Sequence, residues 1–143
     1  MSFNLPLPPT PVFETERLIL RPLEIGDAPA IQRRFPKWEV VRWLHAGIPW
    51  PYPEDGALTH TKVSEALREK GERFYWSLFL KGGPDETIGR IDLWPGVEGR
   101  DMRGFWLDSD YWGRGLMTEA ADRVTAYAFE ELTGRSSTSP TPR

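Results

Sequence analysis

Three strand-forming segments separated only by short turns constrain the fold more than any other feature of this chain. Residues 74–80, 87–94 and 102–108 are rich in aromatic and aliphatic side chains. A Gly-Gly-Pro-Asp turn at 82–85 follows the first segment, and residues 95–101 separate the other two. Because turns this short join antiparallel neighbours, the pattern predicts an antiparallel β-meander.

The rest of the chain predicts one further strand and three main helices. The strand covers residues 17–22 and ends at Pro22, which has no N–H for a ladder. Asp27 and Asp55 are suitable N-caps. Capping and apolar spacing predict helices at 28–34, 56–70 and 116–132. This order of elements predicts an α+β fold with a mixed, mostly antiparallel sheet flanked by helices.

Length and composition exclude several classes of function. A chain of 143 residues fits one domain. With 18 Lys and Arg against 21 Asp and Glu, no overall field draws it to nucleic acid or an anionic membrane. No stretch approaches the roughly 18 apolar residues of a membrane span, and no signal-peptide pattern is present. We therefore expect a cytoplasmic protein with no nucleic-acid or membrane partner. The absence of cysteine and the two isolated histidines predict no metal site.

A glycine loop lies between the last predicted strand and the last predicted helix. Gly113 and Gly115 precede the helix that begins near Leu116. Such a loop gathers unpaired backbone N–H groups at the positive end of the helix dipole, an arrangement that suits phosphate. The spacing alone fits a ligand-free tight turn equally well. The third glycine of a dinucleotide fingerprint and the Gly-Lys-Ser/Thr of a P-loop are both missing.

Three segments, taken in order, resemble GNAT N-acetyltransferases of the branch related to ribosomal-protein N-terminal acetyltransferases. They are TERLILRPL at 15–23, IGRIDL at 88–93, and FWL at 105–107 followed by YWGRGLMTEA at 111–120. The resemblance covers about residues 15–132. It implies a GNAT-like fold and transfer of an acetyl group from acetyl-CoA to a primary amine, either a protein N-terminus or a small amine.

The resemblance also implies how acetyl-CoA is held. The strand is implied to lie along the pantetheine arm, and the loop to wrap the pyrophosphate with main-chain N–H groups. The implied contact residues are Phe105, Trp106, Leu107, Trp112, Gly113, Arg114, Gly115, Leu116, Met117 and Thr118. The implied reaction is direct attack of the amine on the thioester, with strand N–H groups holding the oxyanion. Because an amine of pKa ~10 is protonated at neutral pH, some base or water chain must first remove its proton.

The sequence departs from the family pattern at three positions. Trp112 opens the loop where many members have Gln or Arg, and Met117 stands where a small residue is common. Because the loop works through its backbone, these two changes are compatible with binding. Met102 stands where a Glu often precedes the strand by two positions in this branch. The general base is therefore not identified by the resemblance.

The candidates for the base and for the acceptor site each have a plain structural alternative. Asp92 could accept the proton or bind the ammonium group, or be a solvent-facing carboxylate paired with Arg90. Glu39 is a second candidate base. The candidate substrate residues are Trp38, Glu39, Arg42, Trp50 and Tyr52. Residues 38–43 would otherwise be a solvated helical face, and the two aromatics of the proline-rich segment 48–53 would be hydrophobic anchors. Glu119 is interpreted as complementing the helix dipole, and His45 and His60 as structural or surface residues.

The two ends of the chain differ from the middle. We predict an N-terminal arm at 1–14, an incomplete acetyltransferase domain at 15–132 and a disordered tail at 133–143. The tail has no apolar side chain, so it cannot form the buried strand that follows in the family. We expect a truncated or frame-shifted enzyme whose strand around Phe105 exposes an edge open to self-association or strand swapping, including a homodimer through that edge. An intact natural protein that ends here, and completes its sheet by dimerisation, is the alternative. The alternatives to an active enzyme are an inactive folded fragment and an anion-binding interaction module.

Overall fold

The computed structural model describes residues 6–37, 40, 52–95 and 101–132, and of residues 101–103 it describes the backbone only. The strands are β1 (Phe13–Glu14), β2 (Leu18–Pro22), β3 (Phe74–Leu80), β4 (Gly89–Pro95) and β5 (Asp101–Leu107). The helices are α1 (Ala28–Arg34), α3 (Gly56–Glu69) and α4 (Leu116–Tyr127). Short helical turns are η1 (Ile25–Asp27), η2 (Ser109–Tyr111) and the π-helical η3 (Ala128–Leu132).

The five strands form one antiparallel sheet in the order β1-β2-β3-β4-β5. The predicted meander is therefore confirmed, and its three strands begin within two residues of the predicted positions. Strands β2 and β3 are neighbours although the helices α1 and α3 lie between them in sequence. The described sheet is antiparallel throughout, so the α+β class is confirmed and no described strand pair is parallel.

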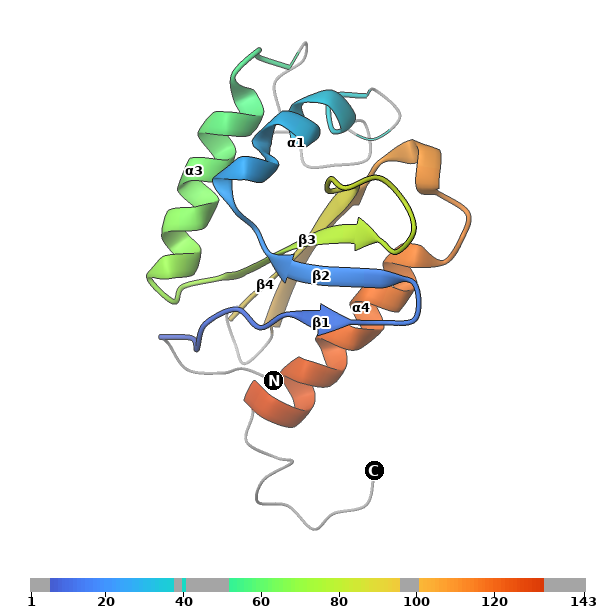
Figure 1. Cartoon of the computed structure of the whole chain (residues 1–143). Helices are drawn as coiled ribbons and strands as arrows, with labels where there is room; N and C mark the ends of the chain where they lie inside the picture. Colours follow the sequence, from blue (N-terminus) through green and yellow to red (C-terminus); the bar gives the residue numbers. More distant parts are fainter. Residues whose placement is uncertain (1–5, 38–39, 41–51, 96–100, 133–143) are drawn as a thin grey trace.

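Helices cover both faces of the sheet, with α1 and α3 on one side and α4 on the other (Figure 1). In β3, Phe74, Trp76 and Leu78 belong to the α4 side of the core, whereas Tyr75 belongs to the α1 and α3 side. This alternation follows from the two-residue period of a strand, and it explains why β3 reads as a continuous apolar run. The sheet is buried on both faces at its centre.

The N-terminal segment packs on the domain more than its prolines suggest. Residues Phe13–Glu14 pair with β2, and the Phe13 ring stacks on Trp76 with 5.6 Å between centroids. The Leu7 N–H donates to the Gly71 carbonyl at 2.7 Å, and the Leu7 side chain is buried. Buried apolar side chains thus hold residues of the predicted 1–14 arm against the sheet, and the predicted boundary at residue 15 stays a prediction.

The outer edge of β5 has no strand partner among the described residues. The homodimer expected through this edge stays a prediction. The predicted tail at 133–143 and most of the predicted turns at 36–44 and 48–53 lie outside the described residues. Within the described part of the chain, no helix has the length and apolar character needed to cross a membrane.

Candidate functional site

The glycine loop connects β5, through η2, to the first turn of α4. Gly113 and Gly115 have φ values of 78° and 75°, in the left-handed region that glycine adopts without a side-chain clash. Gly115 is the N-cap of α4, and no side chain caps this helix end. Within the described structure, the backbone N–H groups of residues 113–118 have no hydrogen-bond acceptor. Six consecutive free donors at a helix N-terminus form an arrangement that binds an anion such as a phosphate.

Asp108 anchors the start of this loop. Its buried carboxylate accepts hydrogen bonds from the Asp110 N–H at 3.1 Å, from Arg34 Nη1 at 2.7 Å and from Lys37 Nζ. Burial raises the pKa of Asp108, but the bonds from Lys37, the Asp110 N–H and Arg34 outweigh it and lower the pKa overall. The carboxylate therefore stays charged and ties α1 to the end of β5.

The side chains of the loop residues differ in their contacts and exposure. The Trp112 indole is 43% exposed and donates to the Leu107 carbonyl at 2.8 Å. The Arg114 guanidinium lies over the Tyr111 ring at 5.3 Å from its centroid, close to the loop. Leu116 is buried in the core, Met117 is partly buried against it, and Thr118 is exposed.

The β5 residues of the predicted cofactor site divide between the two faces of the sheet. Trp106 packs against Phe35 on the α1 and α3 side, with 5.2 Å between ring centroids, and Leu107 is in the core under α4. Phe105 is 55% exposed. Because the Asp108 N–H bonds to the Ile88 carbonyl, the alternation of the ladder turns the backbone of Trp106 toward β4 and that of Phe105 and Leu107 toward the open edge. Since the Leu107 carbonyl already accepts from Trp112, this edge can offer a ligand the Phe105 backbone and the Leu107 N–H.

Asp92 lies in the middle of β4, between Tyr75 of β3 and Gly104 of β5 in the sheet register. It is 5% exposed, so the expectation of a solvent-facing carboxylate is wrong, while the predicted pairing with Arg90 is confirmed at 3.0 Å between Oδ1 and Nε. Neither atom has an aligned hydrogen bond within the described residues. Burial raises the pKa of Asp92 to about 6, against the opposing charges of Arg90 and Arg73. A carboxyl with this pKa changes charge close to neutral pH, as a general base requires.

Two arginines lie near this carboxyl, and a histidine contacts one of them. The Arg73 guanidinium lies 4.0 Å from the Trp94 ring centroid and donates to the Tyr75 hydroxyl at 3.3 Å. Arg90 Nη1 is 3.2 Å from His60 Nδ1. Desolvation of the imidazole, followed by the charges of Arg90 and Arg73, lowers the pKa of His60 to about 4. His60 is thus a weaker base than Asp92, in agreement with its predicted structural role.

Of the predicted substrate residues, only Tyr52 is described. Its ring packs edge-on against Phe35 at 5.2 Å between centroids, and burial raises its pKa. This packing is the hydrophobic anchor that was the alternative to a substrate contact. Trp38, Glu39, Arg42 and Trp50 lie outside the described residues, so their predicted roles stay predictions.

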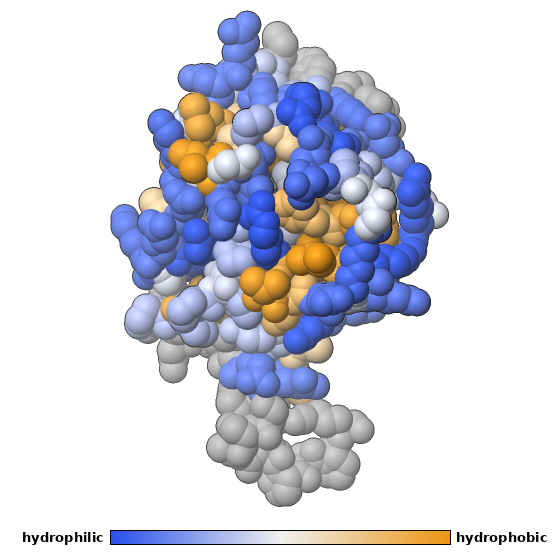
Figure 2. All heavy atoms as spheres, viewed as in Figure 1, coloured by the Kyte–Doolittle hydropathy of each residue, from blue (hydrophilic) through white to orange (hydrophobic). Residues whose placement is uncertain are grey.

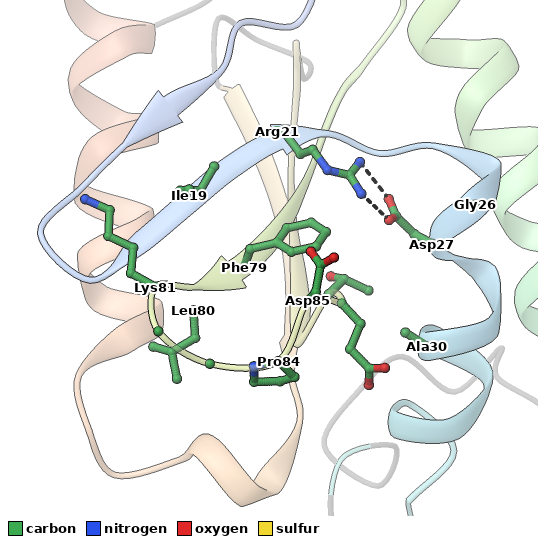
Figure 3. Close-up of a pocket in the computed structure, with 14 residues that line it drawn as sticks. Ile19, Arg21, Gly26, Asp27, Ala30, Phe79, Leu80, Lys81, Pro84 and Asp85 are labelled. Atoms are coloured by element: carbon green, nitrogen blue, oxygen red, sulfur yellow. Dashed lines mark hydrogen bonds and ion pairs between the residues drawn. The ribbon is translucent and has the colours of Figure 1, made fainter.

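A cavity of about 570 Å³ opens elsewhere, between β2, β3, α1 and the β3–β4 turn. Hydrophobic side chains are exposed over β2 and β3 between hydrophilic ones (Figure 2). Arg21 in its wall pairs with Asp27 at 2.7 Å (Figure 3), and Lys81 pairs with Glu14 at 2.5 Å. These charged groups are already paired with other side chains of the chain, and none of the predicted cofactor or substrate residues lines the cavity. We do not assign it a ligand.

Glu119 is the residue whose role the sequence understated. Its carboxylate accepts hydrogen bonds from Thr15 and Arg17 in the β1–β2 turn. These contacts connect residues more than one hundred positions apart in the chain. The only sequence signal for them was that both segments belong to the family-like motifs.

Comparison with known protein families assigns the chain to a family. The family model of the acetyltransferase (GNAT) domain matches residues 17–141. The chain therefore belongs to the GNAT acetyltransferase family, as its three motifs predicted.

Curated relatives are similar over parts of their length. The "Probable N-acetyltransferase YjcK" of Bacillus subtilis (strain 168) is 36% identical over 75 residues, which are 50% of this chain and 40% of that protein. The "Uncharacterized N-acetyltransferase p20" of Bacillus licheniformis is 27% identical over 121 residues, which are 82% of this chain and 66% of that protein. The chain thus spans less than two thirds of either relative.

Solved structures share the fold. An acetyltransferase from Agrobacterium tumefaciens str. C58 has 28% identity and a TM-score of 0.64, covering 86% of this chain and 69% of that one. RimL, a ribosomal L7/L12 alpha-N-protein acetyltransferase solved in complex with coenzyme A, has 21% identity and a TM-score of 0.64. That match covers 82% of this chain and 68% of RimL.

Proposed function

We propose that this chain binds acetyl-CoA and transfers the acetyl group to a primary amine, either a protein N-terminus or a small amine. The observation that carries the proposal is the row of free N–H groups at 113–118, around two left-handed glycines at the start of α4. Family membership and the coenzyme A complex of RimL support the choice of ligand.

Each part of the site has a defined task in this proposal. The loop N–H groups of 113–118 hold the pyrophosphate, and the open edge of β5 faces the pantetheine arm. Acetyl-CoA supplies an activated thioester when bound. The amine nitrogen forms a bond to the thioester carbon, the carbon–sulfur bond breaks, and the thiolate leaves.

Asp92 is the proposed proton acceptor in this reaction. Its carboxylate is unprotonated above a pKa of about 6, and its Oδ1 lacks an aligned hydrogen bond within the described residues. The Asp92 carboxylate takes a proton from the substrate ammonium group, and the neutral amine that results then attacks the thioester. Arg73 and Arg90 lie beside the carboxylate and favour the neutral form of the amine, because like charges disfavour the ammonium ion.

Cofactor binding is tested by calorimetry with CoA and with inorganic pyrophosphate. We expect Gly113→Ala to weaken CoA binding about tenfold, because a side chain strains the left-handed backbone and turns the N–H groups. The matched control is Gly82→Ala, since Gly82 has a φ of 74° and, like Gly113, has open space around it. The control should lose similar stability and keep its CoA affinity.

The outcomes separate the three interpretations of the chain. Equal affinity for CoA and pyrophosphate would favour an anion-binding module. CoA binding without CoA release from acetyl-CoA, in the presence of a free-N-terminus peptide and of a small amine, would favour an inactive acetyltransferase fold. The absence of CoA binding by the wild-type chain would contradict the proposal.

The role of Asp92 is tested by the pH dependence of kcat/KM. We expect the rate to rise with pH through about 6, and Asp92→Asn to lose that limb together with a factor of roughly 100 to 10,000 in rate. CoA affinity should stay unchanged in Asp92→Asn. Asp85→Asn, at an exposed position in the β3–β4 turn, is the charge-matched control and should keep the wild-type profile.

A further inference from the structure

The β1–β2 turn holds the carboxylate of Glu119 with three hydrogen bonds. Thr15 Oγ1 donates to Oε2 at 2.5 Å and the Arg17 N–H donates to the same oxygen at 2.8 Å. Arg17 Nε donates to Oε1 at 2.8 Å. The Glu119 side chain is only 17% exposed. Both carboxylate oxygens are therefore occupied, and the first turn of α4 is connected to the N-terminal part of the sheet.

Arg17 also reaches the glycine loop itself. Its Nη1 donates to the Arg114 carbonyl at 2.7 Å, while its Nε remains on Glu119. One guanidinium group thus bridges the helix and the peptide unit between Arg114 and Gly115. A planar guanidinium holds two acceptors in a fixed relative geometry, which an ammonium group cannot do.

Because of peptide-bond geometry, this contact also fixes the direction of the Gly115 N–H. In a trans peptide the C=O and the following N–H point in opposite directions. With the Arg114 carbonyl held toward Arg17, the Gly115 N–H points to the other side of the loop. Gly115 has a φ of 75° and lacks a side chain to restrain it, so an external contact is needed to keep one orientation.

The same contacts remove an electrostatic conflict. A free carboxylate in the first turn of α4 would repel a phosphate bound to the neighbouring N–H groups. Here Glu119 is compensated by the Arg17 charge and by two further donors. Burial raises the pKa of Glu119, but the hydrogen bonds from Thr15 and Arg17 lower it overall.

We propose that Thr15, Arg17 and Glu119 form a positioning clamp that presets the 113–118 loop for the pyrophosphate of the cofactor. This inference rests on the proposed acetyl-CoA binding and goes beyond it, because none of the three residues contacts the ligand in the proposed mode. The clamp acts on the phosphate half of the ligand and not on the pantetheine half.

The experiment compares two ligands on matched variants. We expect Glu119→Gln and Thr15→Val to raise the Kd for CoA about tenfold, the effect of a lost charge-assisted hydrogen bond. The Kd for pantetheine, which has no pyrophosphate, should not change. Thr15→Ser keeps the hydroxyl and should restore CoA affinity. The control is Glu14→Gln, which removes the same charge from β1 and breaks only the pair with Lys81.

Two results would overturn the clamp. One is a CoA affinity within twofold of wild type in both clamp variants. The other is an equal loss of CoA and pantetheine affinity, which would indicate general loosening of the fold. Thermal unfolding of each variant identifies any that do not fold.

A failure of acetyl-CoA binding can be told apart from a failure of the clamp. If the wild-type chain binds no CoA, the proposed function is wrong, and amide ¹⁵N relaxation then tests the clamp without ligand. The order parameter of the Gly115 amide should fall from about 0.85 toward 0.6 in Glu119→Gln and stay unchanged in Glu14→Gln. An unchanged value in Glu119→Gln would contradict the clamp.

Discussion

Two carboxylates on the same side of the sheet, Asp27 and Asp92, are buried to the same degree but differ in the hydrogen bonds they accept. Asp27 is 4% exposed and Asp92 is 5% exposed. Asp27 accepts hydrogen bonds from Arg21 Nη2 at 2.7 Å, Ser77 Oγ at 2.7 Å and the Glu24 N–H at 3.0 Å. Asp92 has an arginine beside it but no aligned bond to Oδ1 within the described residues.

The difference shows that burial alone does not define the role of an acid. A buried carboxylate with several donors is a structural centre, and here it joins β2, β3 and the start of α1. A buried carboxylate with unfilled hydrogen-bonding capacity is destabilised as an anion and therefore suited to taking a proton. The same comparison explains why Asp27, although it is the N-cap of α1, makes no capping bond to that helix. Its oxygens are occupied by other donors.

The largest effect is expected from Asp27→Ala. It leaves the Arg21 guanidinium, the Ser77 hydroxyl and the Glu24 N–H without their acceptor, so unfolding in urea should show a loss of about 3–5 kcal/mol. Asp85→Ala, at an exposed position, should change stability by no more than ~0.5 kcal/mol. A loss below about 1 kcal/mol for Asp27→Ala would remove the distinction between the two acids.

Asp92→Asn should change stability in the opposite direction to Asp27→Ala and make the folded chain more stable. The pKa of Asp92 lies at about 6 in the folded chain against an ordinary value of 3.8, so the folded state binds the proton more tightly. Stability therefore falls as pH rises from about 4 to about 6, and the cost is constant above that range. At pH 8 the neutral variant should be more stable by about 3 kcal/mol, at ~1.4 kcal/mol for each pH unit between the two values.

The same unfolding experiment contains its own control for Asp92→Asn. At pH 3.5 the carboxyl is mostly protonated in the folded and unfolded states, and the advantage of the variant should disappear. An advantage that does not depend on pH would show that packing, and not the buried charge, separates the two proteins.

Arg90→Gln should have an intermediate effect, seen in the pKa values of Asp92 and His60. Removing the positive charge beside Asp92 and His60 raises the pKa of both groups, by about one pH unit for Asp92. NMR titration of the carboxyl carbon and of the imidazole measures both changes. Arg33→Gln, which removes a more exposed arginine paired with Glu86, should leave both titrations in place. A fall in either pKa would contradict the assigned electrostatics.

The smallest effect is expected from Gly104→Ala. An added Cβ would lie 3.2 Å from Asp92 Oδ2, so the side chain of Asp92 must move by a few tenths of an ångström. We expect a stability loss of no more than about 1 kcal/mol, together with a further rise in the pKa of Asp92 as the methyl group excludes water. Gly26→Ala, which meets no atom within 4 Å, is the control for helix and turn propensity.

The sequence was sufficient for the elements and for the glycine loop. Strand-forming runs, turn residues and apolar spacing act locally, so β3, α1 and α3 follow from their own residues. Asp27 and Asp55 occupy the predicted N-cap positions but make no side-chain capping bond. The strand β1 was not predicted, because two residues carry no periodicity and the surrounding prolines favour an irregular arm. Phe13 is a strand residue only because Leu20 pairs with it and Trp76 covers it.

The roles of the acids could not be predicted to the same extent. Asp92 was a candidate base by its position in a motif, but its burial depends on Tyr75 and Gly104, which lie on two other strands. Glu119 was interpreted through its own helix alone. Its actual partners, Thr15 and Arg17, are brought to it by the packing of the β1–β2 turn against α4.

What the sequence by itself determined is therefore the class of fold, the family and the position of the glycine loop before α4. Each of these rests on residue types and spacings that are close together in the chain. The tertiary structure decided which carboxylate is satisfied and which is left unsatisfied, and what fixes the direction of the Gly115 N–H. Hydrogen bonding and desolvation depend on neighbours in space, and those neighbours come from segments up to about one hundred residues apart.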